Sequence, residues 1–191
     1  MNTNMLKKLK DPRYAYHLTY PKLTVIVTSG TFEKPNAMAA SWHTHLSFEP
    51  PLYGVSIAPR RYTYKLIKET GEFCVNFLPF ELSEKVWQTG LVSGEEIDKF
   101  SKFGLTKKEA SAVKAPIIEE SITVLECKVV HEYPVGDHIF FVGEIVAAWY
   151  REDLVVNDRG LLDPRKAMHV YYLGEGRFLT LDPKTLKKFE V

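Results

Sequence analysis

Cysteine is scarce in this sequence. Only two occur among its 191 residues, Cys74 and Cys127, and each lies inside an apolar run typical of a strand. So few cysteines exclude a scaffold held together by several disulfides. The two residues permit one bridge, but two reduced cysteines in the core of a cytoplasmic protein are the favoured interpretation.

Long apolar stretches and an excess of charge are also absent. No apolar stretch approaches the roughly 18 to 20 residues that a membrane-spanning helix requires. Residues 1–10 carry lysines but not the apolar region of a secretion signal. The 25 Lys and Arg residues balance 24 Asp and Glu residues, which leaves a net charge of +1. We therefore expect a cytoplasmic protein whose partners are neither nucleic acids nor membranes.

Several catalytic motifs are missing as well. The sequence has no Gly-x-Gly-x-x-Gly unit between a strand and a helix, since Gly174 and Gly176 lie in a predicted hairpin without a third glycine. It also has no P-loop, His-Glu-x-x-His, Cys-x-x-Cys or Gly-x-Ser-x-Gly. These absences argue against a Rossmann dehydrogenase, a P-loop NTPase and the common hydrolases.

What the sequence does contain indicates a packed, predominantly β domain. With 45% apolar and 13% aromatic residues, and no linker or repeat, residues 1–191 are expected to form a single domain. Runs rich in β-branched and aromatic residues predict strands at 23–28, 52–58, 73–78, 121–133, 138–150, 169–173 and 177–181. Helices are predicted only at 63–70 and 82–89. Short turns at 134–137 and 174–176 make consecutive strands hairpin partners, which favours an antiparallel barrel or sandwich.

Two neighbouring segments have the residue types of a ligand site. Ala39, Ala40 and Ser41 are small enough to let a flat heterocycle approach the backbone, although a strand packed beneath a helix is the commoner explanation of such residues. Further on, Arg61 and Thr63 lie where a strand ends and a helix begins, and free backbone N–H groups at such a point bind anions. The alternative there is a pair of solvated arginines beside an ordinary helix N-terminus.

Both segments lie within Asn36–Leu78, which reads NAMAASWHTHLSFEPPLYGVSIAPRRYTYKLIKETGEFCVNFL and resembles the flavin reductase-like family with the FMN-binding split barrel. Further matching segments follow in the same order: EEIDKF at 95–100, PIIEES from 116, LEC at 125–127, GDHIFFVGEI at 136–145 and YYLGEGRF at 171–178. The resemblance covers roughly residues 15–180. It implies an all-β fold with a few helices, an antiparallel Greek-key split β-barrel of the FMN-binding type.

The resemblance also implies a homodimer in which each barrel binds one FMN near the interface. By residue matching, the cofactor-binding residues are Asn36, Ala37, Met38, Ala39, Ser41, Trp42, Ser56, Ile57, Ala58, Arg61, Tyr62, Thr63, Gln88 and Thr89. The first six would line the isoalloxazine ring and the ribityl chain, and the next three would border the other side. The three residues from Arg61 would hold the phosphate, and the last two would contact the cofactor.

His138 is the predicted catalytic residue. It matches the Gly-Asp-His of the family and is expected to position the nicotinamide or the reducible substrate, with Asp137 orienting its ring or raising its pKa. The alternative is a turn histidine that donates to a nearby carbonyl. His169 stands where family members contact the dinucleotide, but Met-His-Val replaces the usual Pro-Leu-Leu there. Tyr171 equally fits packing in the barrel or at the dimer interface.

The sequence thus predicts an FMN-binding oxidoreductase that takes hydride from NADH or NADPH. It would pass the electrons to free flavin for a partner oxygenase, to a ferric complex or to another small-molecule acceptor. One alternative is an FMN-binding module for storage, sensing or electron relay without NAD(P)H turnover. Another is an all-β protein that holds a metal through His43 and His45, but only Glu49 lies nearby as a further ligand, so no metal site is predicted.

Overall fold

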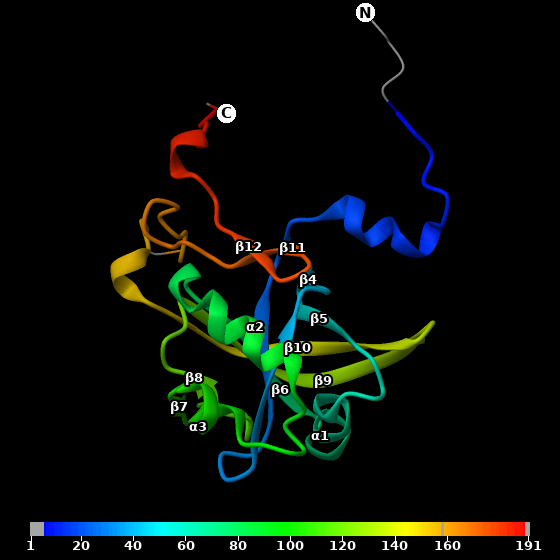
Figure 1. Ribbon diagram of the computed structural model, residues 1–191. Helices are drawn as coiled ribbons and strands as arrows, with labels where there is room; N and C mark the ends of the chain where they lie inside the picture. Colours follow the sequence, from blue (N-terminus) through cyan, green and yellow to red (C-terminus); the bar gives the residue numbers. More distant parts are fainter. Residues whose placement is uncertain (1–5, 158, 190–191) are drawn as a thin grey trace, which may run out of the picture.

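A seven-stranded sheet forms the centre of the protein (Figure 1). The computed structural model describes residues 6–157 and 159–189. Neighbouring strands are all antiparallel and follow the order β3-β2-β6-β9-β10-β5-β4. Their bounds are β2 Val25–Gly30, β3 Pro35–Ala40, β4 His43–Phe48, β5 Pro51–Ile57, β6 Glu72–Phe77, β9 Thr123–Val135 and β10 His138–Tyr150. The predicted all-β class and the long β9–β10 hairpin are confirmed.

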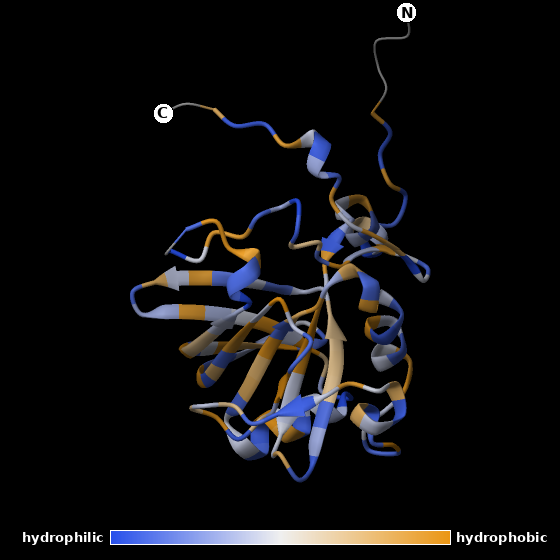
Figure 2. Cartoon of the chain, turned by 90° about the vertical axis from the view of Figure 1, so that its left-hand side faces the viewer, coloured by the Kyte–Doolittle hydropathy of each residue, from blue (hydrophilic) through white to orange (hydrophobic). Residues whose placement is uncertain are grey.

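The core lies against the middle strands of this sheet. Its main cluster includes Val25, Val55, Phe73 and Phe141, all with no exposed surface. A second cluster, which includes Ile26, joins β2 and β3 to helices α2 and α3. Figure 2 shows the apolar residues concentrated on the central strands and hydrophilic residues at the connecting loops. Strands buried on both faces lose the polar alternation of a surface sheet, which explains the continuous apolar runs in the sequence.

In the described part of the chain, three short α-helices cover the sheet. They are α1 (Tyr62–Thr70), α2 (Ser83–Leu91) and α3 (Lys99–Phe103). Gly71 ends α1 in the left-handed conformation with φ of 71°, as expected for a glycine C-cap. The two predicted helices are confirmed with ends shifted by one or two residues, whereas α3, which Asp98 caps, was not predicted. Within residues 6–157 and 159–189, no helix is both long and apolar enough to cross a membrane.

Smaller elements complete the fold. β1 (Lys22–Leu23), β11 (Tyr171–Gly174) and β12 (Arg177–Leu179) form a three-stranded sheet, and β7 (Lys107–Lys108) pairs with β8 (Ile117–Ile118). Four 3₁₀ helices are η1 Pro12–Thr19, η2 Phe80–Leu82, η3 Glu152–Leu154 and η4 Pro183–Thr185. The last predicted hairpin is confirmed, but it is shorter than predicted because residue 169 forms only an isolated bridge with residue 79.

Strands β3 and β4 are the main departure from the sequence prediction, which included no strand at residues 35–48 among its predicted strands and gave one for the small residues only as an alternative. The alternative given for the small residues is correct in part, because β3 does pack beneath α2: a side chain added at Gly90 would meet Ala39 at 3.6 Å. The same strand also borders a cavity, whose lining includes Ala39 and Ala40.

Candidate functional site

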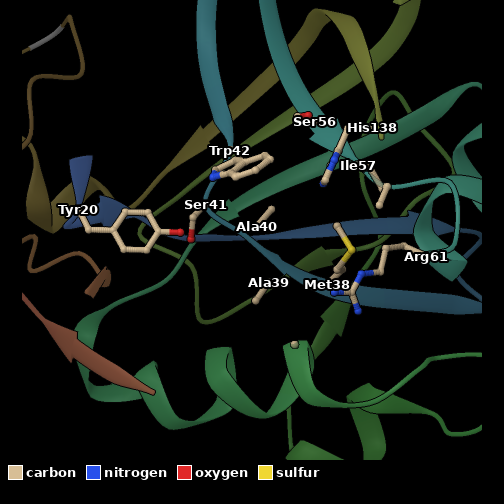
Figure 3. A pocket seen from close by; sticks show the side chains of 12 residues that line it. Tyr20, Met38, Ala39, Ala40, Ser41, Trp42, Ser56, Ile57, Arg61 and His138 are labelled. Carbon is tan, nitrogen blue, oxygen red and sulfur yellow. The ribbon is translucent and has the colours of Figure 1, made fainter. Parts of the chain in front are cut away.

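A cavity of about 210 Å³ opens beside β3, and we call it the ring cavity. It lies between β3, β5, the start of α1 and the end of α2 (Figure 3). Its lining consists of Tyr20, Met38, Ala39, Ala40, Ser41, Trp42, Ser56, Ile57, Ala58, Arg61, Gly90 and His138. Small and apolar side chains form most of these walls, so a flat molecule can reach the backbone of β3 and β5.

A second cavity of about 120 Å³ adjoins the first. We call it the cation cavity because positively charged side chains line it. The two share Met38, Arg61 and Gly90 in their walls. The remaining lining residues are Asn36, Arg60, Tyr62, Thr63, Thr89, Leu91, Val92, Ser93, Gly94 and Lys99. Together the cavities make an elongated site with an apolar part and a polar part.

The lining of the cation cavity is positively charged. Its lining contains the side chains of Arg60, Arg61 and Lys99 and no carboxylate. Lys99 is only 3% exposed, and burial, with the nearby charge of Arg61, lowers its pKa to about 8. An ammonium has three N–H donors. Among the described residues, the Thr89 carbonyl accepts a hydrogen bond from Lys99 Nζ at 2.7 Å. A buried ammonium without an acidic partner is costly, so this arrangement favours an anionic ligand.

Asn36 provides a further polar group in the wall of the cation cavity. Its side chain is 1% exposed, and its Nδ2 donates to the Thr63 hydroxyl at 2.7 Å. Its Oδ1 has no hydrogen-bond partner among the described residues. A Cβ at Gly94 would lie 2.0 Å from that oxygen, so only glycine permits this close approach. A buried acceptor without a partner is rare in folded proteins, and a bound hydroxyl group would satisfy it.

The start of α1 adds backbone donors to the cation cavity. Arg61 occupies the N-cap position, and its side chain makes no capping hydrogen bond. The first N–H groups of a helix without a capping side chain are free to bind an anion, and the helix dipole favours negative charge there. The first N–H groups of α1, the Arg61 guanidinium and the buried Lys99 ammonium therefore all lie at the cation cavity.

His138, the first residue of β10, lies at the rim of the ring cavity. Its Nδ1 is 2.7 Å from Oδ1 of Asp137, and its ring centroid is 5.0 Å from that of Trp42. The hydrogen bond with His138 lowers the pKa of Asp137, so that the carboxylate remains charged. The predicted contact between these two residues is therefore present, and it holds the imidazole beside the cavity.

Most residues predicted to bind the cofactor line one of the two cavities. Two do not. Ala37 is fully buried in the apolar cluster that joins β3 to α2 and α3. Gln88 lies on α2, where its Nε2 donates to Glu84 at 3.2 Å. The lining residues that the sequence prediction missed include Tyr20 and Lys99. Lys99 lies in the quoted EEIDKF segment, but nothing in the sequence distinguishes a buried lysine from an exposed one.

The histidines proposed as alternative metal ligands have other roles. Nδ1 of His43 is 2.6 Å from the Tyr53 hydroxyl, and its Nε2 is 3.0 Å from the Leu23 carbonyl. Burial lowers the pKa of His43, which keeps the ring neutral. His45 packs edge-on against Tyr53, with ring centroids 4.7 Å apart. Over the described part of the chain, no three His, Cys, Asp or Glu side chains are placed to hold a metal ion.

The remaining residues of interest lie away from His138. His169 lines a separate cavity of about 640 Å³ together with His45, Tyr53 and Phe77, and no lining residue is common to this cavity and the ring cavity.

Cys74 and Cys127 are both buried and free, which confirms the prediction of two reduced cysteines.

Comparison with known proteins decides the family. The model of the flavin reductase-like domain matches residues 17–171. The chain belongs to this family. The resemblance inferred from the sequence is therefore confirmed over most of the chain.

Individual relatives agree with this assignment. A ferric-chelate reductase (NAD(P)H) of Archaeoglobus fulgidus is 30% identical over 132 residues, which cover 69% of this chain and 77% of the relative. A putative flavin reductase with a split barrel domain from Shewanella frigidimarina superposes with a TM-score of 0.83 at 25% identity, covering 98% and 95% of the two chains. An FMN-binding protein from Thermus thermophilus, with bound p-hydroxybenzaldehyde, has a TM-score of 0.84 at 29% identity, covering 97% and 100%. The split-barrel fold is thus confirmed.

Proposed function

We propose that this protein is an FMN-dependent oxidoreductase that takes hydride from NADH or NADPH and passes electrons to a small-molecule acceptor. The observation that carries the proposal is the continuity of the apolar ring cavity with the cation cavity, because FMN joins a flat heterocycle to a phosphate through a polyol chain. The relatives support it, since one is an FMN-binding protein and another a ferric-chelate reductase (NAD(P)H). When bound, FMN would supply the redox chemistry by accepting hydride and releasing electrons.

The protein's own task is to bind and orient. Arg61, Lys99 and the first N–H groups of α1 would hold the phosphate, and the Asn36 Oδ1 would accept a hydrogen bond from a hydroxyl of the ribityl chain. The small side chains of β3 would leave room for the ring. His138 would hold the nicotinamide or the acceptor in line from the rim of the ring cavity, a positioning role that needs no proton transfer by the imidazole.

The cofactor released by heating the purified protein is expected to be FMN and not FAD. The cation cavity provides one anion site, and the sequence has no glycine-rich turn for a second phosphate. Chromatography of the released flavin beside FMN and FAD standards identifies which of the two the protein binds. FAD as the dominant species would contradict the proposal, as would a protein that binds neither flavin.

The His138→Ala variant is expected to keep its FMN but to be reduced by NAD(P)H about ten to a hundred times more slowly. This corresponds to about 1.4 to 2.8 kcal/mol of lost transition-state stabilisation, in the range of a positioning contact. Anaerobic stopped-flow mixing of the FMN-loaded protein with NADH and NADPH measures the rate.

The matched control is His131→Ala, because His131 is an exposed histidine on β9. Its reduction rate should equal that of the wild type. Equal rates for all three proteins would make His138 a turn residue only. A wild type that is never reduced by either nucleotide would instead favour an FMN-binding module for storage or electron relay. With a reducible wild type, ferric chelates and free flavins are the first acceptors to assay.

A homodimer is expected in solution, with twice the 21.9 kDa mass of one chain. Strand β4 lies at one end of the sheet order, and its Leu46 and Phe48 are 42% and 99% exposed. An apolar edge strand is a surface for pairing. Light scattering at micromolar concentration should show the dimer, and Phe48→Asp should shift it toward monomer. The control is Phe189→Asp, since Phe189 is also exposed but lies near the C-terminus. A monomeric wild type would contradict the prediction.

A further inference from the structure

The cavity of about 640 Å³ that His169 lines lies apart from the proposed flavin site, and we call it the aromatic cavity. It is larger than the ring cavity and the cation cavity, and it shares no lining residue with either. Most of its walls come from strands β4, β5, β6, β9 and β10 and from the segment that follows β10. Small-molecule pockets commonly have volumes of about 300 to 1,000 Å³, and the proposed function makes no use of this one.

Aromatic residues dominate the walls of this cavity. Phe77 lies edge-on to both Tyr53 and His169, with ring centroids 6.4 and 6.2 Å apart. His45 is also edge-on to Tyr53, at 4.7 Å. Trp149 lines the same cavity and is 39% exposed. Aromatic rings around one space favour a flat aromatic ligand, which can contact them in stacked or edge-to-face geometry.

Hydrogen bonds within the protein hold two of these rings in place. Nε2 of His43 lies 3.0 Å from the Leu23 carbonyl, which can only accept, so Nε2 carries the proton of this neutral ring. Nδ1 of His43 therefore accepts from the Tyr53 hydroxyl at 2.6 Å. On the opposite strand pair, Nε1 of Trp149 donates to Glu126 at 2.6 Å. Both walls are thus positioned before a ligand arrives, which lowers the cost of binding.

The charge of the lining distinguishes between kinds of aromatic ligand. Among the described residues that line the cavity, Arg159 carries a formal charge and none is a carboxylate. Burial lowers the pKa of His169, so its ring is neutral at pH 7 and adds no charge. A carboxylate would pair with the guanidinium of Arg159, whereas an amine would be repelled by it. The lining therefore favours an aromatic acid over an aromatic amine.

We propose that the aromatic cavity is a second ligand site, which binds a flat aromatic carboxylate with its ring beside Phe77, His169 and Trp149 and its carboxylate at Arg159. This ligand is distinct from the flavin, and the proposal does not depend on the function proposed above. Trp149 and Tyr150 are also exposed enough to contact a second copy of the chain, and the experiment below separates that outcome from ligand binding.

The first test is calorimetric titration of the FMN-supplemented protein with 2-naphthoate and with 2-naphthamide, which has a similar shape but no charge. The wild type should bind both and should bind 2-naphthoate more tightly. Arg159→Gln should weaken 2-naphthoate about two- to fivefold, the effect of one exposed ion pair, and leave 2-naphthamide unchanged. Arg151→Gln is the matched control, because Arg151 is exposed, pairs with Asp153 and does not line this cavity. It should bind both ligands as the wild type does.

The second test fills the cavity. Ala148 is an exposed residue of β10 that lines the aromatic cavity but neither of the other two cavities. Ala148→Phe should lose the binding of both ligands because its ring takes up the space. Ala148→Ser, which adds only a hydroxyl group, should bind them as the wild type does. Unchanged FMN affinity in Ala148→Phe would show that the variant is folded and that the two sites are separate.

Several results would overturn the proposal. They are ligand binding that survives Ala148→Phe, equal affinities of the wild type for 2-naphthoate and 2-naphthamide, and no binding of either ligand to the wild type. Light scattering should give Ala148→Phe the same oligomeric state as the wild type. A change of that state would assign the cavity to contact with a second copy of the chain and would also overturn the proposal. Failure of the proposed function would be seen separately, as a protein that binds no FMN or is not reduced by NAD(P)H.

Discussion

The Lys99→Met variant is expected to bind FMN about 30 to 150 times more weakly than the wild type. Lys99 is 3% exposed and has no acidic partner in the cation cavity, so a phosphate would be its main counter-charge. A hydrogen bond to a charged group that is shielded from water contributes about 2 to 3 kcal/mol, which gives this factor. Arg61, which is exposed, should contribute less because water screens its charge. Fluorescence titration of the FMN-free protein with FMN measures the affinity.

A charge-matched control lies on the same helix. Lys102 is an exposed residue of α3, so Lys102→Met removes one lysine from the same element without touching the cavity. Its FMN affinity should remain within about twofold of the wild type, because a distant, screened charge adds little. Equal losses in the two variants would show that only net charge matters. An unchanged affinity in Lys99→Met would place the phosphate elsewhere.

The pH dependence of binding follows from the lowered pKa of Lys99, which is about 8 in the folded protein. FMN affinity should fall as the pH rises through 8, because the ammonium that pairs with the phosphate loses its proton. The contribution of Lys99 to the free energy of unfolding of the FMN-free protein should change in the opposite sense. At Lys99 the unfolded chain binds more protons than the folded one between pH 8 and about 10.4, so this contribution rises with pH there, by at most about 3 kcal/mol. It is measured as the difference in stability between the wild type and Lys99→Met across this pH range.

The strands and helices that the sequence predicted correctly share a strong local signal. β6 is a short apolar run closed by Pro79, and α1 ends at Gly71, the residue type that adopts the left-handed C-cap. β3 lacks such a signal because it consists of alanine, proline, asparagine and methionine, and the first three of these residue types have low strand propensity. It becomes a strand through pairing with β2, a tertiary contact that no local pattern contains.

The candidate site shows the same limit. The proposed anion site at the start of α1 can be inferred from the sequence because Arg61 and Thr63 adjoin it along the chain. Lys99 and Tyr20 were not, because they reach the cavities from segments 36 or more residues away from Thr63 along the chain. Tyr20 is a local neighbour of other tyrosines, and only the placement of η1 directs it toward Ser41. Burial and direction of a side chain depend on the assembled fold, whereas helix ends depend on adjacent residues.

The Glu126→Gln variant is expected to lose about 2 to 4 kcal/mol of the free energy of unfolding. Glu126 on β9 is fully buried, and its carboxylate accepts hydrogen bonds from the Ser111 N–H at 2.8 Å, the Ala112 N–H at 2.6 Å and Nε1 of Trp149 at 2.6 Å. The Ser111 hydroxyl donates as well, at 3.0 Å. Glutamine keeps the size but loses the charge and turns an NH₂ group toward these donors, which leaves at least one buried donor unsatisfied. Urea denaturation of the FMN-free protein measures the loss.

The effect should depend on pH in a way that identifies the carboxylate. Burial by itself would raise the pKa of Glu126, but the hydrogen bonds from Ser111, Trp149 and Ala112 together lower it below its usual value. The ionised side chain therefore stabilises the fold above the unfolded pKa of about 4.3, and this contribution is lost as the pH falls through the lower folded value. The difference between wild type and Glu126→Gln should shrink accordingly in acid. Glu132→Gln is the control, since Glu132 lies on the same strand, is 43% exposed and pairs with Lys68; it should cost less than about 1 kcal/mol. Equal stabilities of Glu126→Gln and the wild type at neutral pH would mean that the carboxylate does not hold the loop at Ser111 against β9.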